Sequence, residues 1–184
     1  HASYRRQRQM CIRDRQSGDT EGDVNFTIDF LDLASNSGSR VTTLTSGDKI
    51  VYDETVPTLP TVDISSNNSN GATFAKVGDV ITISVSASEN IQTPTVTIAG
   101  NAASIATGSN GERVYTATYT MQSSDNTGVI PFTVDFSDMA NNAGTQVTAV
   151  ANDSDGGVTF DKQAPSFTTV TMSSNNSTST LAIV

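Results

Sequence analysis

Apolar and polar residues alternate with a period of two over three long segments of the chain. The segments are DVITISVSAS at 79–88, RVYTATYTM at 113–121 and VIPFTVDF at 129–136. Ile, Val, Tyr, Ala and Phe occupy one face of each, and Thr, Ser and Asp occupy much of the other. Alternation of β-branched and aromatic residues with polar ones is typical of a half-buried antiparallel strand. The pattern therefore predicts a strand in each segment.

Shorter runs of the same kind predict six further strands, separated by residues that favour turns. Asn70-Gly71, Gly100-Asn101 and Gly156-Gly157 are examples of such turn pairs. No segment shows a convincing period of 3.6, so we expect no helix. Short strands with turns about every 8–12 residues are typical of a β-sandwich or a β-barrel. The shorter strands are expected at 61–65, 72–76, 94–99, 101–106, 145–150 and 157–160.

Three motifs occur twice, with a constant displacement of about one domain length. They are FTIDFLDLASNSG at 26–38 and FTVDFSDMANNAG at 132–144, DETVP at 53–57 and DKQAP at 161–165, and SSNNS at 65–69 and 173–177. The displacement is 106 residues for the first motif and 108 for the others. Solenoid units are typically about 20–50 residues long, whereas a β-sandwich domain has about 100.

The repeat divides the chain into one complete copy and two partial ones. Residues 16–56 are the end of one copy, 57–164 a whole copy, and 165–184 the start of a third. The ends of a sandwich lie at opposite poles, so copies can follow one another through short linkers. The linkers at 53–57 and 161–165 each end in proline, which stiffens the backbone. We therefore predict an all-β chain of tandem antiparallel β-sandwiches.

The first fifteen residues differ in composition from the rest of the chain. Five of the ten basic residues, the only Cys and the only His fall within 1–15. Residues 5–15 resemble a translated sequencing adaptor, and ten consecutive residues from Arg5 match one reading frame of it. The alternatives are a basic nucleic-acid-binding arm and a truncated targeting peptide, but the apolar core of a signal peptide is missing. We expect 1–15 to be non-native and disordered.

Without these residues the chain has 5 basic and 18 acidic side chains, a net charge of −13, and neither Cys nor His. Nucleic-acid binding needs clustered Lys and Arg, so an acidic chain is not expected to bind it. No apolar run reaches about 18 residues, the length that spans a membrane as a helix. A Ser nucleophile has no imidazole base, and nothing singles out a pair of carboxylates for glycoside hydrolysis. We expect no enzymatic activity.

Three features together resemble the bacterial immunoglobulin-like repeats found in tandem in large secreted and surface-attached proteins. They are the Asp-x-x-x-Pro linker at 161–165, SASENI at 86–91, and the FxVDFxDxANNAG run at 132–144. The run is similar to an Asp-x-Ala-Gly-Asn turn of that family, with Asn141 where Gly is usual. The resemblance covers 16–184. It implies an immunoglobulin-like antiparallel β-sandwich, a place outside the cell or on its surface, and no catalytic residues.

The resemblance implies a non-catalytic structural or adhesive spacer, as in an adhesin stalk, whose partners are neighbouring repeats of the same chain. The alternative is a ligand-binding accessory module of an extracellular enzyme that contacts carbohydrate or another surface. Exposed Ser and Thr faces would suit contacts with glycans or other cell-surface molecules. Thr also suits any solvated strand face, so these residues alone do not distinguish a binding module from a spacer.

Acidic residues near strand ends are candidate calcium ligands. Glu89 follows a long strand, Asp138 opens a turn, and Asp161 begins a linker. Calcium takes about 6–8 oxygen ligands, so three carboxylates with Asn141 or Asn142 would suit it at a joint between domains. The alternative is that Asp and Asn stand there because they favour turns. Calcium is the one cofactor that the sequence suggests.

Overall fold

The computed structural model of the chain describes residues 16–108, 111–150 and 157–178. The predictions for 1–15 and for the last part of the third copy lie outside these residues. The strands are β1 (Gly22–Asp23), β2 (Val51–Tyr52), β3 (Thr61–Ser66), β4 (Phe74–Ala75), β5 (Val80–Ser86), β6 (Thr95–Ile98), β7 (Asn101–Ala102), β8 (Ser104–Gly108), β9 (Gly111–Thr120), β10 (Gly128–Val129), β11 (Phe132–Asp135) and β12 (Thr159–Phe160).

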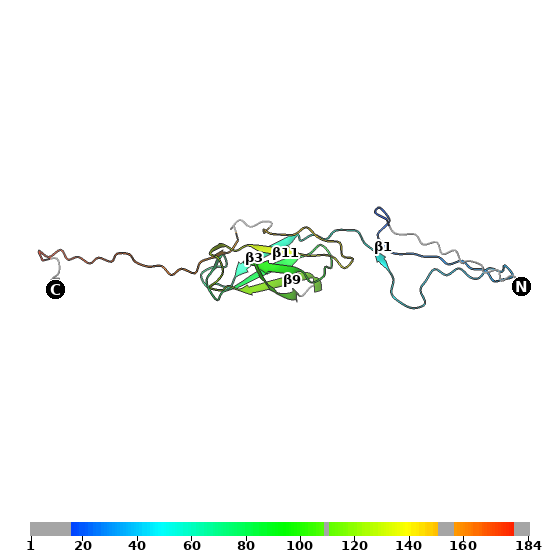
Figure 1. The fold of residues 1–184 in the computed structure, drawn as a ribbon, viewed down its shortest axis with the longest axis horizontal. Coiled ribbons are helices and arrows are strands. Elements are labelled where there is room, and N and C mark those ends of the chain that lie inside the picture. Colours follow the sequence, from blue (N-terminus) through cyan, green and yellow to red (C-terminus); the bar gives the residue numbers. More distant parts are fainter. Residues whose placement is uncertain (1–15, 109–110, 151–156, 179–184) are drawn as a thin grey trace.

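The prediction of an all-β chain with antiparallel sheets is confirmed. No described residue is helical, so this part of the chain holds no helix that could cross a membrane. Figure 1 shows strands β3 to β12 gathered in the middle of the molecule, in a central unit that we define as residues 57–164. The N-terminal segment (16–56) and the C-terminal segment (165–178) extend from its opposite ends.

The predicted strands at 79–88 and 113–121 form, as β5 and β9. β5 and β9 pair antiparallel over their whole common length, with Ile83 opposite Ala117. β3 and β8 complete a four-stranded sheet in the order β3-β5-β9-β8. In β5 the residues alternate strictly between buried and half-buried, because successive side chains of a strand point to opposite faces.

The predicted strand at 129–136 is divided into β10 and β11 at Pro131, which has no N–H to donate to a ladder. β11 pairs with β6 in the sheet β11-β6-β7, and β10 pairs with β12 in the sheet β10-β12-β4. Apolar side chains from these two sheets and from the four-stranded sheet form one buried cluster. It includes Ile81, Ile83, Val96, Ile98, Tyr115, Phe132, Val134 and Phe160.

The predicted strand at 145–150 is reduced to a single bridge, between Val134 and Val147. The next bridge along the hairpin joins Ser137 to Ala143, so the register slips by one residue between the two. One extra residue interrupts a ladder in this way at a β-bulge. The alternating pattern of the sequence could not reveal this slip, because each strand alone keeps its period of two.

The N-terminal segment makes the same backbone contacts as the second half of the central unit. Gly22 lies opposite Tyr52, as Gly128 lies opposite Phe160. The bulged hairpin also recurs. The bridge from Ile28 to Val41 corresponds to the bridge from Val134 to Val147, and the bridge from Leu31 to Ser37 corresponds to the bridge from Ser137 to Ala143. The local geometry of the two copies is therefore the same.

Burial differs between the copies although the backbone contacts agree. Val134 is fully buried, whereas Ile28 at the corresponding position is 51% exposed. The C-terminal segment shows the same contrast with β3, since Val62 is 6% exposed and its counterpart in the next copy, Val170, is 82% exposed. Only the central unit brings together the strands that cover these side chains.

Candidate functional site

The turn that follows β11 is built around the buried carboxylate of Asp138. Its Oδ1 accepts hydrogen bonds from the backbone amides of Ala140 and Asn142, both at 2.8 Å. Its Oδ2 accepts a third from the Asn142 side chain, also at 2.8 Å. Asn141 has φ 72°, in the left-handed region that Asn tolerates better than most residues. These contacts explain why Asp and Asn occupy these positions even without a metal.

A second strand end fixes this turn against the central unit. The Gln92 side chain donates to the Asp138 carbonyl at 2.8 Å and to Asn141 Oδ1 at 2.9 Å. The neighbouring residue Ile91 bridges Asp138, and its carbonyl accepts a hydrogen bond from the buried Tyr115 hydroxyl at 2.9 Å. The turn is therefore fixed to the central unit by residues 91–92, in addition to its own internal hydrogen bonds.

Two further carboxylates lie beside Asp138. One oxygen from each of Asp53, Glu89 and Asp138 falls within 4.8 Å of the others. Asp53 and Glu89 also line an open groove of about 460 Å³ between the N-terminal segment and the central unit, together with Glu21 and Ser88. The structure thus places an acidic cluster at the joint where the chain enters the central unit.

Glu89 has a raised pKa in this environment. Burial raises the pKa of the Glu89 carboxyl above its ordinary value, and the charges of Asp53 and Asp138 raise it further. Arg113 opposes this shift. The direction shows that the negative charge on Glu89 is disfavoured where it stands, as expected when carboxylates approach one another without an equal number of cations.

Of the three predicted calcium ligands, the structure brings Glu89 and Asp138 together and places Asp161 elsewhere. The Asp161 amide donates to the Ala75 carbonyl at 2.9 Å, beside β4, and its Oδ1 accepts from the Gln163 amide at 2.8 Å. Asp53 stands in its place in the cluster. Asp53 and Asp161 are the first residues of the two matching linkers. The sequence repeat therefore indicated Asp53 as the equivalent of Asp161.

The side chains of Asn141 and Asn142 are both engaged in hydrogen bonds near the cluster. Asn141 Oδ1 accepts from Gln92, and the Asn142 amide donates to the Asp53 carbonyl at 3.0 Å. The three carboxylates could offer oxygen ligands to a cation there. Asn142 makes these hydrogen bonds through its N–H groups, so they do not exclude its Oδ1 as a further ligand. The calcium site stays a prediction, now with Asp53 in place of Asp161.

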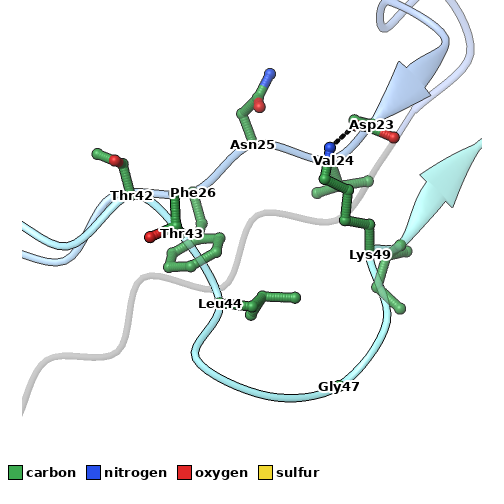
Figure 2. A pocket seen from close by; sticks show the side chains of 10 residues that line it. Asp23, Val24, Asn25, Phe26, Thr42, Thr43, Leu44, Gly47 and Lys49 are labelled. Atoms are coloured by element: carbon green, nitrogen blue, oxygen red, sulfur yellow. Dashed lines mark hydrogen bonds and ion pairs between the residues drawn. The ribbon is translucent and has the colours of Figure 1, made fainter.

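An apolar hollow of about 550 Å³ lies in the N-terminal segment. Phe26 and Leu44 line it, and Lys49 closes one end through an ion pair with Asp23 (Figure 2). Phe26 corresponds to Phe132, which is buried in the core of the central unit. We therefore interpret the hollow as the uncovered core of a partial repeat, not as a ligand pocket.

A comparison of the chain with protein-family models, with curated proteins and with solved structures finds no match.

Proposed function

We propose that this chain is a non-catalytic segment of a tandem array of immunoglobulin-like β-sandwiches, serving as a structural and adhesive spacer in a large extracellular or surface-attached bacterial protein. The observation that carries the proposal is the recurrence of backbone contacts with the same displacement as the sequence motifs. The Val24 amide donates to the Ile50 carbonyl at 2.8 Å, and the Ile130 amide donates to the Val158 carbonyl at 2.9 Å. The repeat is therefore present in the hydrogen bonds as well as in the sequence motifs.

The strand order supports the immunoglobulin-like assignment. One sheet of such a domain has the order A-B-E-D and the other contains C, F and G. If the strands are lettered in the order in which they occur along the chain, β3, β5, β8 and β9 take the letters A, B, D and E. Their order in the sheet, β3-β5-β9-β8, is then A-B-E-D. β6 with β11, and β10 with β12, correspond to the pairs C–F and F–G.

The exposed side chains of the partial copies support an array. Phe167 is 91% exposed and Met172 is 98% exposed, whereas their counterparts in the complete copy, Leu59 and Ile64, pack against the core of the central unit. In an array, the remaining strands of the same repeat would cover these apolar groups.

Two experiments test the proposal. The gene that encodes this chain is expected to continue the same period on at least one side of the segment, and a gene without any further copy would contradict the array. A glycan array probed with the full chain distinguishes the spacer from a carbohydrate-binding accessory module. A spacer is expected to give no reproducible hits, whereas saturable binding to one glycan class would favour the module.

A further inference from the structure

Direct hydrogen bonds hold the linker at 53–57 on the end of the central unit. The Asn142 side chain donates to the Asp53 carbonyl at 3.0 Å, although the two residues are far apart in the sequence. The Thr58 amide donates to Ser88 Oγ at 3.0 Å, and the Ser88 amide donates to the Thr58 carbonyl at 2.9 Å. Between these contacts Pro57 is fully buried. The linker is therefore held on the central unit at both of its ends, whereas the Glu54 amide in its middle donates to Glu21 Oε1 of the N-terminal segment at 2.9 Å.

Hydrogen bonds within the turn orient the surface that receives the linker. An Asn side-chain amide has two N–H donors. In Asn142 one donor is directed to Asp138 Oδ2, at 2.8 Å, and the other is directed to the linker carbonyl. Gln92 holds the same turn from the opposite side. A group already fixed in its bound orientation loses little entropy when the linker docks.

Both halves of this contact occur a second time in the chain. The turn of Asp32 and Asn36 repeats the contacts of Asp138 and Asn142, with the Asn36 side chain donating to Asp32 Oδ2 at 2.9 Å. The linker geometry recurs as well. The Thr55 amide donates to Asp53 Oδ1 at 3.0 Å, and the Gln163 amide, at the matching position of the second linker, donates to Asp161 Oδ1 at 2.8 Å.

From this correspondence we infer that the turn at 138–142, together with Ser88, is a docking surface for the linker of the preceding repeat, and that Asn142 is the residue that holds the linker on it. The inference rests on the proposed array and deepens it. Each repeat carries one such turn and ends in one such linker, so the same joint forms at every junction. The joint fixes the direction in which one repeat follows another.

The competing explanation is that Asn142 only stabilises its own turn. Asn36 is a matched control, because it makes the same bond within its turn but has no linker contact among the described residues. Ser88→Ala is an independent variant, since it removes the acceptor of the Thr58 amide without altering the turn. Together the variants separate docking of the linker from folding of the turn.

The test is amide hydrogen exchange in the full chain, measured by NMR at Thr55 and Thr58 in the linker region and at Ile83 in the core strand β5. Asn142→Ala is expected to accelerate exchange at the linker amides about fivefold more than at Ile83, the factor that corresponds to one ordinary hydrogen bond. A smaller acceleration at Ile83 reports the lost hydrogen bond to the buried Asp138 carboxylate. Ser88→Ala is expected to accelerate Thr58 in the same way.

Asn36→Ala is expected to change none of these rates. Unchanged linker exchange in Asn142→Ala would overturn the inference, and so would equal acceleration at Ile83, because Asn142 would then be a general structural residue. Linker amides that exchange at the rate of an unfolded chain in the unmodified protein would also overturn it. None of these results depends on the gene sequence or the glycan array, so a failure of the joint can be told apart from a failure of the proposed array.

Discussion

Gly144 lies against the Phe136 ring, and Gly38 lies against the Phe30 ring in the same way. This pair of contacts tests whether the same contact contributes equally to the free energy of unfolding in both copies. A Cβ atom added at Gly144 would lie 2.2 Å from Cε2 and 2.3 Å from Cζ of the Phe136 ring. Ordinary contacts begin near 3.4 Å, so the ring would have to retreat well out of its present position. Phe136 is only 8% exposed and belongs to the core cluster, which leaves it little room to move.

Gly144→Ala is therefore expected to destabilise the central unit. Overpacking of a core typically costs about 1–3 kcal/mol. For a unit of this size a loss of about 2 kcal/mol corresponds to a fall in Tm of roughly 10 °C. Circular dichroism or calorimetry of the full chain measures this shift. Combining the substitution with Phe136→Leu is expected to recover part of the loss, because neighbouring positions that share one contact are not additive.

Gly38→Ala is the matched control for this experiment. A Cβ atom at Gly38 would lie 2.2 Å from Cε2 of Phe30, which is the same clash. Phe30 is 53% exposed, however, so its ring can turn into solvent. The substitution is expected to change the Tm by little more than an ordinary surface mutation, within about 0.5 kcal/mol. An equal fall in Tm for both variants, or none for Gly144→Ala, would refute the argument from burial.

Two further predictions concern ionisable groups. If calcium occupies the acidic cluster, millimolar calcium is expected to raise the Tm by an amount that corresponds to roughly 1 kcal/mol. Glu89→Gln is expected to abolish this rise in Tm, whereas Asp161→Asn is expected to preserve it. Loss of the shift in both Glu89→Gln and Asp161→Asn would return the site to the set predicted from the sequence, which contains both residues. Hydrogen bonds from the Lys76 amide and then from the Asn68 side chain lower the pKa of Asp79 below its ordinary value. The stability that they contribute is present above about pH 4 and is lost as the pH falls below it. The Tm difference between the protein and Asp79→Asn, measured by calorimetry, is therefore expected to shrink as the pH falls through the lowered pKa of Asp79. A difference that stays constant on acidification would contradict this explanation.

The fold could be predicted wherever one strand carries its own signal. The alternation at 79–88 and at 113–121 is local, and β5 and β9 form there. The predicted strand at 145–150 fails because its pairing depends on a one-residue slip against the strand it meets, as the bridge from Val134 to Val147 records. A register is a property of two strands together, and neither strand encodes it alone.

The candidate site shows the same division between local and distant information. Residues predicted as calcium ligands near one turn and one strand end, Asp138 and Glu89, do lie together. The prediction named Asp161 as the third ligand, whereas the structure places Asp53 beside Glu89 and Asp138. The linker that begins with Asp53 contacts the unit that follows it, through the hydrogen bond from the Asn142 side chain to the Asp53 carbonyl. The spacing from Asp to Pro is the same in both linkers, so only the position of the receiving turn distinguishes them.

The two copies separate what a sequence determines locally from what packing adds. Asp32 and Asp138 collect the same three hydrogen bonds from the residues that follow them, because those partners lie within four positions along the chain. Burial does not follow the same rule. Ile28 and Val134 have equivalent bridges, yet only Val134 is covered, since its cover comes from strands such as β6 that are distant in sequence. The turn's hydrogen bonds therefore recur in both copies of the motif, whereas burial of the neighbouring apolar side chains depends on strands that are distant in sequence.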